Sequence, residues 1–155
     1  MLNNVLLSLL IFFTGLGIGA GLYETLVVYP RWKKDPTPAT LAQLLESSGQ
    51  NAALKFWPLV SPMSALLSII NMMVAWRNAG PLTIWFSAAL IIFLKSLATY
   101  LYFAPTMMRK FRRAETMDTD KLKKSVARWT SLSPVRIVVE TVAWIGALST
   151  LLSLH

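Results

Sequence analysis

Long apolar runs, separated by short polar segments, dominate the hydrophobic pattern of the chain. Four such runs cover residues 5–28, 56–76, 82–108 and 133–154. An α-helix rises about 1.5 Å per residue, so roughly 20 apolar residues cross the ~30 Å hydrocarbon core of a bilayer. The pattern therefore predicts an all-α fold, a four-transmembrane-helix antiparallel bundle that forms one integral membrane domain over residues 1–155.

Two polar loops of this pattern carry short amphipathic stretches. In the first loop, Thr37-Pro38 is typical of a helix N-cap followed by a first-turn proline, and Leu41, Leu44 and Leu45 make one apolar face. In the second loop an apolar stripe alternates with basic residues. The stripe consists of Leu122, Val126 and Trp129, and the basic residues are Lys121, Lys123, Lys124 and Arg128. We expect both stretches to be interfacial helices on the membrane surface.

Composition agrees with a membrane protein and excludes much chemistry. Hydrophobic residues make up 55% of the chain and charged residues 14%. There is no cysteine, and the one histidine is His155, the last residue. Disulfides, thiolate metal sites and a Ser-His-Asp triad within the fold are excluded. We expect neither a metal site nor a cofactor.

The net charge of +8 is distributed unevenly between the loops. Thirteen Lys and Arg side chains belong to the two long loops and their flanks, whereas Arg77 alone belongs to the opposite side. Cationic loops stay in the cytoplasm, so this asymmetry predicts a plasma (inner) membrane protein with both long loops cytoplasmic and both termini outside. Because the charge flanks apolar runs and does not line a groove, we expect the lipid bilayer and no nucleic acid as a partner.

Three charged residues lie inside the apolar runs. Lys95 is near the centre of the third run, Glu24 lies toward the end of the first, and Glu140 lies in the fourth. A cation at bilayer depth is costly, so Lys95 should face the protein interior and have a partner. An antiparallel bundle allows all three to meet in the half of the membrane nearest the basic loops. They are our candidate catalytic residues, as a general base or a proton carrier.

Small and polar residues surround these charges. Gly17 and Gly21, like Gly15 and Gly19, form small-xxx-small pairs that let helices approach closely. Arg136 and Glu140 form an i, i+4 pair, and Asn71 continues a serine face on the second run. The candidate substrate-binding residues are Tyr23, Asn71, Tyr102, Trp129, Arg136 and Trp144.

Each of these features also has a structural interpretation. Lys95 can have a purely structural role, in which it neutralises a glutamate and fixes the register of the helices. Arg136 can anchor at the membrane interface, and the serine face can serve packing alone. The sequence leaves these alternatives open.

Short motifs in order along the chain resemble the anthrone-oxygenase-like family of small four-helix membrane proteins. They are Gly19-Ala-Gly-Leu-Tyr23-Glu24-Thr-Leu-Val-Val-Tyr-Pro30, Tyr102-Phe-Ala-Pro105, and Trp129 followed by Arg136. The resemblance implies an integral-membrane bundle. For some members it implies cofactor-free oxygenation of a polyketide anthrone to an anthraquinone. Without an internal histidine, this chain would need Glu24, Glu140 or neutral Lys95 as its base.

Two functional hypotheses follow. In the first, a membrane enzyme takes a hydrophobic aromatic or quinone-like molecule from the bilayer, a carboxylate removes a proton, and Lys95 and Arg136 stabilise the anion. In the second, the protein is not an enzyme but a lipophile binder, a proton-coupled carrier or an assembly subunit with a structural Lys–Glu pair. The glycine face is compatible with a homo-oligomer in either case.

Overall fold

The computed structural model describes residues 2–34, 36–40, 43, 50–79, 83–106 and 116–154. All elements in these ranges are helices, and four of the helices are long and apolar enough to cross a membrane. The predicted all-α transmembrane bundle is thereby confirmed, and the protein is an integral membrane protein.

The helices follow one another along the chain with two changes of helical type. The bounds are α1 (Leu2–Tyr23), the π-helical segment η1 (Glu24–Val28), α2 (Tyr29–Lys34), α4 (Gln50–Ala79), α5 (Ile84–Ala98), the π-helical segment η2 (Thr99–Phe103) and α6 (Thr119–Ser153). Segments α1, η1 and α2 form one uninterrupted span, as do α5 and η2. Each span overlaps one of the predicted apolar runs, although the third span, Ile84–Phe103, is shorter than its predicted run of residues 82–108.

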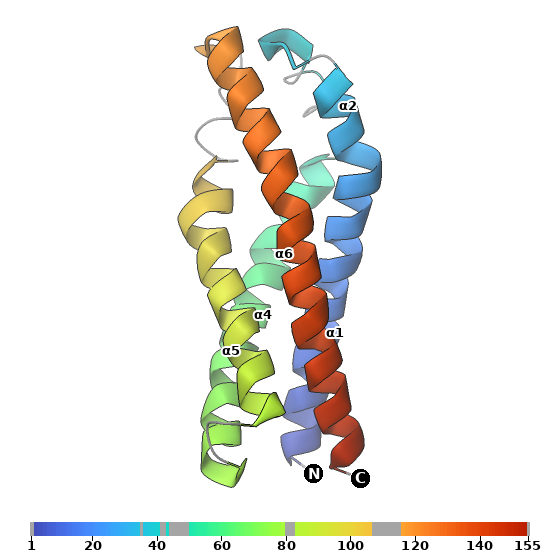
Figure 1. The fold of residues 1–155 in the computed structure, drawn as a ribbon, viewed down its shortest axis with the longest axis vertical. Helices are drawn as coiled ribbons and strands as arrows, with labels where there is room; N and C mark the ends of the chain where they lie inside the picture. Colours follow the sequence, from blue (N-terminus) through green and yellow to red (C-terminus); the bar gives the residue numbers. More distant parts are fainter. Residues whose placement is uncertain are drawn as a thin grey trace.

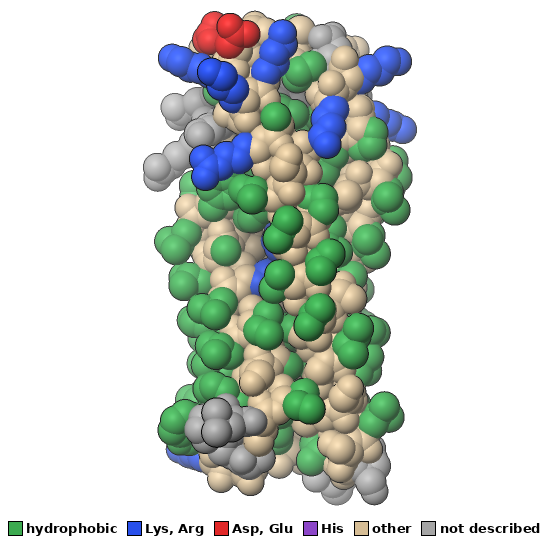
Figure 2. All heavy atoms as spheres, in the orientation of Figure 1, with side chains coloured by type: hydrophobic (Ala, Val, Ile, Leu, Met, Phe, Trp, Pro, Cys, Tyr) green, Lys and Arg blue, Asp and Glu red, His purple; other side chains and the backbone are tan. Residues whose placement is uncertain are grey.

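The four spans pack in a ring, in the order α1, α4, α5, α6 and back to α1 (Figure 1). The beginning of α1 and the end of α6 lie together at one end of the bundle, here called the terminal end. Exposed cations gather at the opposite end, here called the basic end (Figure 2). They are Arg31, Lys33, Lys34, Lys121, Lys123, Lys124 and Arg128. Hydrophobic side chains cover the surface between the two ends, as contact with lipid requires.

The glycines of α1 divide between two surfaces. A Cβ atom on Gly17 would lie 3.2 Å from the Glu140 carboxylate, and one on Gly21 would lie 3.0 Å from Ile137, so both glycines pack against α6. Gly19 is exposed and has no neighbour within 4 Å of its Cβ position. The first of the two predicted glycine pairs therefore serves close helix packing.

Both π-helical segments end two residues before a proline. The N–H of Tyr29 donates to the carbonyl of Glu24, and the N–H of Ala104 donates to the carbonyl of Thr99. Pro30 and Pro105 follow directly. A proline has no N–H and its ring crowds the carbonyl four residues earlier, so a wider i→i−5 turn accommodates it within a continuous span.

The basic stretch of the second loop differs from the expectation of a separate surface helix. It forms the first turns of α6, which runs for 35 residues through Pro134 and is roughly 52 Å long. Its apolar stripe is buried in an aromatic cluster at the basic end and does not lie against lipid. This cluster consists of Val28, Tyr29, Trp32, Phe103, Leu122, Val126 and Trp129. Packing against α2 therefore keeps the stripe in line with the span.

Side-chain caps explain where two of the helices begin. Thr83 accepts a hydrogen bond from the N–H of Phe86 at the start of α5, and Asp118 accepts one from Lys121 at the start of α6. In the first loop Thr37 accepts one from the N–H of Thr40, as its position before Pro38 predicts. The apolar face that we expected at residues 41, 44 and 45 lies outside the described residues.

Candidate functional site

Lys95 faces the interior of the bundle and forms an ion pair with Glu140. Its Nζ lies 2.5 Å from Oε1 of Glu140, and the two side chains are only 8% and 3% exposed. Helix α5 supplies the lysine, and α6 supplies the glutamate. Gly17 of α1 lets the third helix approach the same carboxylate. The predicted partner of Lys95 is thus one of the two embedded glutamates.

The other embedded glutamate has different partners. Oε1 of Glu24 accepts a hydrogen bond from the indole N–H of Trp57 at 2.7 Å, and Oε2 accepts one from the hydroxyl of Tyr29 at 3.0 Å. Both donors are neutral. Among the side chains that the structure describes, which do not include those of residues 50–55, the sole ion pair within 4.0 Å is Lys95–Glu140, so Glu24 has no cationic partner in that set.

Local helix geometry explains how Tyr29 reaches Glu24. In an α-helix, residues five apart point about 140° away from each other. In a π-helix they lie close to one turn apart, because the backbone hydrogen bond itself spans five residues. The η1 segment begins at Glu24 and ends one residue before Tyr29, so it places the hydroxyl over the carboxylate.

Arg136 lies between two aromatic rings. Its Cζ is 5.3 Å from the centre of the Trp57 ring and 4.7 Å from that of Phe103. These distances are those of cation–π contacts. Within the described ranges the guanidinium has no carboxylate within 4.0 Å. Helix α1 lies close to the guanidinium, since a Cβ atom on Gly21 would be at van der Waals distance, 3.9 Å, from one of its nitrogens.

Trp57 connects the acid and the cation. The edge of its indole donates to Glu24, and its ring contacts Arg136. Glu24 and Arg136 therefore share one indole without forming an ion pair with each other. The arrangement places a carboxylate and a cation in an aromatic, membrane-embedded environment, each with polar or π contacts but without a counter-ion of its own in the described structure.

The aromatic cluster continues from this point toward the basic end. Phe103 meets Trp129 edge to face, with 4.9 Å between ring centres, and Tyr29 packs on Trp32 at 5.5 Å. Tyr102 is half-buried beside the cluster, and Arg128 lies over its ring at 5.4 Å. Trp129 and Tyr102 thus belong to this region, close to Arg136.

Three other candidate residues lie elsewhere. Tyr23 is 58% exposed on the outside of α1. Asn71 is buried near the terminal end, where its amide donates to the carbonyls of Leu6 and Leu67 and accepts from Trp85. The indole of Trp144 donates to the carbonyl of Ile11 at 2.9 Å. Leu6 and Ile11 precede Glu24 by 18 and 13 residues, so Asn71 and Trp144 contact α1 roughly 27 and 20 Å from the carboxylate.

Sequence reasoning missed three contributors to the site: Tyr29, Trp57 and Phe103. All three lie near the ends of their apolar runs, where aromatic residues are typical of the membrane interface. A proline follows each of these residues by one or two positions: Pro30, Pro58 and Pro105. The helix contains a π-turn before Pro30 and Pro105 but stays α-helical at Pro58, so this signal marks where a π-turn can form and does not by itself predict one.

The described residues contain no group of three or more His, Cys, Asp or Glu side chains placed to hold a metal ion. Comparison of the chain with protein-family models, with curated proteins and with solved structures found no match. The resemblance to the anthrone-oxygenase-like family therefore rests on the sequence motifs alone and stays a prediction.

Proposed function

We propose that the protein resides in the plasma (inner) membrane with its basic end in the cytoplasm and both termini outside. Within the described part of the chain, seven exposed cations gather at one end and Arg77 lies exposed at the other, which supports this orientation. Glu24, Trp57 and Arg136 then lie in the cytoplasmic half of the membrane.

We further propose that these three residues bind a hydrophobic aromatic molecule with an acidic C–H or O–H group. The supporting observation is that Glu24 and Arg136 sit on one indole, with no counter-ion within 4.0 Å among the described residues. Glu24 accepts the proton, Arg136 stabilises the anion that results, and the rings of Trp57 and Phe103 contact the aromatic system. The Lys95–Glu140 pair has a structural role, because each charge is already neutralised by the other.

An anthrone is a substrate that fits this chemistry. Loss of a proton from its CH₂ group to Glu24 leaves a stabilised carbanion that reacts directly with O₂. Conversion of CH₂ to C=O removes four electrons, and O₂ accepts four: one oxygen atom becomes the new carbonyl and the other leaves as water. The reaction needs no metal and no organic cofactor.

A second candidate is a membrane protein that binds a lipophile without transforming it, or that acts as a carrier or an assembly subunit. One observation favours it: both oxygens of Glu24 already accept hydrogen bonds, and the buried Lys95–Glu140 pair needs no ligand. Such a protein would retain saturable binding of an aromatic acid and show no turnover.

The decisive experiment measures oxygen consumption and anthraquinone formation from anthrone by the purified protein in lipid nanodiscs. We expect Glu24→Gln to lower the rate at least about 100-fold, the usual contribution of a general base. Arg136→Lys should lower it about 10-fold, because an ammonium group does not reproduce the planar stacking. The matched controls are Asp120→Asn, which also changes an acid to its amide, and Arg77→Lys, both at exposed positions.

Two results would contradict the enzymatic proposal. If Glu24→Gln keeps the wild-type rate within about two-fold, Glu24 is not the base. If the wild-type protein binds anthrone saturably but does not oxidise it faster than protein-free nanodiscs do, the second candidate is correct.

A further inference from the structure

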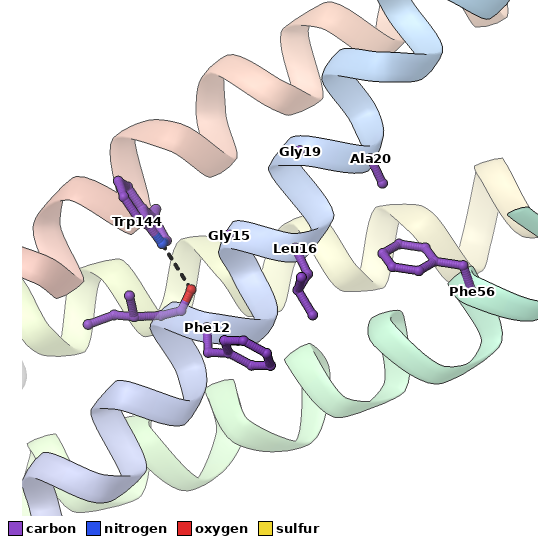
Figure 3. A pocket seen from close by; sticks show the side chains of 8 residues that line it. Phe12, Gly15, Leu16, Gly19, Ala20, Phe56 and Trp144 are labelled. Atoms are coloured by element: carbon purple, nitrogen blue, oxygen red, sulfur yellow. Dashed lines mark hydrogen bonds between the residues drawn. The ribbon is translucent and has the colours of Figure 1, made fainter.

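An open groove runs along the outer face of α1 within the membrane-spanning region. It has a volume of about 570 Å³, within the usual range of small-molecule sites. Its lining is almost entirely apolar, and the residues are Ile11, Phe12, Gly15, Leu16, Gly19, Ala20, Phe56 and Trp144. Figure 3 shows the lining residues of α1 in succession along the helix, with Phe56 on α4 and Trp144 on α6.

Two glycines give the groove its depth. Gly15 lies against the indole of Trp144, since a Cβ atom there would be 3.3 Å from Nε1. The indole is held in place by its hydrogen bond to the carbonyl of Ile11 (Figure 3). Gly19 borders open space. A side chain at position 19 would therefore start in open space and project into the groove.

One end of the groove lies beside the proposed site. Ala20 lies one helical turn before Glu24 on the same span. Phe56 precedes Trp57, the partner of Glu24, and the two rings meet edge to face with 5.3 Å between their centres. The end of the groove at Ala20 and Phe56 is thus adjacent to the carboxylate, while its other end at Phe12 is roughly 12 Å farther along α1.

We propose that this groove binds the apolar tail of the ligand whose acidic aromatic head is held by Glu24, Trp57 and Arg136. The ligand class is therefore an amphipathic molecule: an aromatic acid or phenol with an unbranched hydrocarbon chain about as long as a decyl group. This inference rests on the proposed function, because it takes the position of the head from it. The position of one end of the groove beside Glu24 and Trp57 favours a ligand tail over the acyl chains of the surrounding lipid as its occupant.

The test uses two phenol probes, 4-methylphenol and 4-decylphenol, with binding measured by calorimetry on the full protein in nanodiscs. Gly19→Leu fills the groove, and Gly19→Ala fills it partly. Val138→Phe adds bulk at a 63% exposed position of α6 and serves as the control. Comparing variants in identical nanodiscs cancels the partition of each phenol into lipid.

We expect Gly19→Leu to lower the binding affinity for 4-decylphenol about 5-fold. The loss of affinity should be smaller for Gly19→Ala, and Val138→Phe should cause none. The effect is moderate because the tail moves between two apolar surroundings, so that only packing is lost. Binding of 4-methylphenol should not change in these variants, whereas Glu24→Gln should weaken both probes.

The remaining outcomes separate the two proposals. If Glu24→Gln weakens both phenols but Gly19→Leu leaves 4-decylphenol unchanged, the groove holds only bulk lipid and this inference is wrong, while the head site stands. If Gly19→Leu weakens 4-decylphenol and Glu24→Gln affects neither probe, the groove binds alkyl chains but the proposed function fails. If Gly19→Leu converts a dimer into monomers, the groove is an interface between copies of the chain, and the ligand proposal is overturned.

Discussion

Loss of the Lys95 charge should destabilise the bundle strongly. In Lys95→Met, Glu140 would remain in a position where its side chain is 3% exposed, without the ammonium group that now lies 2.5 Å away. Removing one partner of a buried ion pair costs about 3–5 kcal/mol, because the remaining charge is left uncompensated. Glu140→Leu should cost a similar amount, because the charge of Lys95 would then stay buried without a partner.

The double variant, Lys95→Met with Glu140→Leu, should behave very differently. Apolar side chains of similar volume replace a buried pair with little or no loss of stability, so we expect it to lie within about 1 kcal/mol of the wild type. The two substitutions would then be strongly non-additive, with a coupling energy of several kcal/mol.

The free energy of unfolding can be measured by equilibrium unfolding in mixed detergent micelles, followed by helical circular dichroism. Arg77→Met removes an exposed cation at the terminal end and should change stability by no more than about 0.5 kcal/mol. Additive effects in the double variant, or single variants that cost less than about 1 kcal/mol, would refute the conclusion that the pair fixes the packing of α5 on α6.

The remaining predictions use the same unfolding measurement. Gly17→Ala should destabilise by about 1–3 kcal/mol because its methyl group would crowd the carboxylate of the ion pair. Gly19→Ala should be neutral or stabilise by up to about 1 kcal/mol. Equal effects of Gly17→Ala and Gly19→Ala would contradict the assignment of Gly17 to the packed face of α1 and of Gly19 to its exposed face. Asn71→Leu should cost about 1–3 kcal/mol, since the indole N–H of Trp85 loses its buried acceptor; no loss would mean that water replaces it. Asp118→Ala should cost about 1 kcal/mol by removing the cap of α6, and restoration by Asp118→Ser would confirm the cause.

Much of the fold follows from the sequence because the bilayer limits the choices. An apolar run in lipid has to satisfy its own backbone, so four runs give four helices. The same constraint predicted that Lys95 faces inward to a carboxylate, and the structure identifies Glu140. It also predicted the close approach of α1 at Gly17 and Gly21, since small residues in a span indicate a packing face.

Other parts of the site depend on local helix geometry and on which helices are neighbours, and hydrophobic periodicity predicts neither of these. The π-turn at Glu24 changes the direction of every side chain that follows it, so an α-helical projection does not bring Tyr29 to Glu24. The stripe of Leu122, Val126 and Trp129 shows that one face is buried, but the same pattern suits a membrane surface and a neighbouring helix. The structure shows that the neighbour is α2.

Each of the paired π-turns carries one residue more than a regular helix needs. A π-turn holds one more residue than the α-helical turn that it replaces. Deletion of one residue within residues 25–28 would let the segment relax to an α-helix and would make Tyr29 the i+4 neighbour of Glu24, so that the two side chains stay on one face of the span. If the turn straightened without losing a residue, the rest of the span would rotate by about 100° and Tyr29 would point away from Glu24. In-frame loss of one codon within residues 25–28 or 99–102 would therefore keep the register of these spans, and the Lys95–Glu140 pair would remain in place.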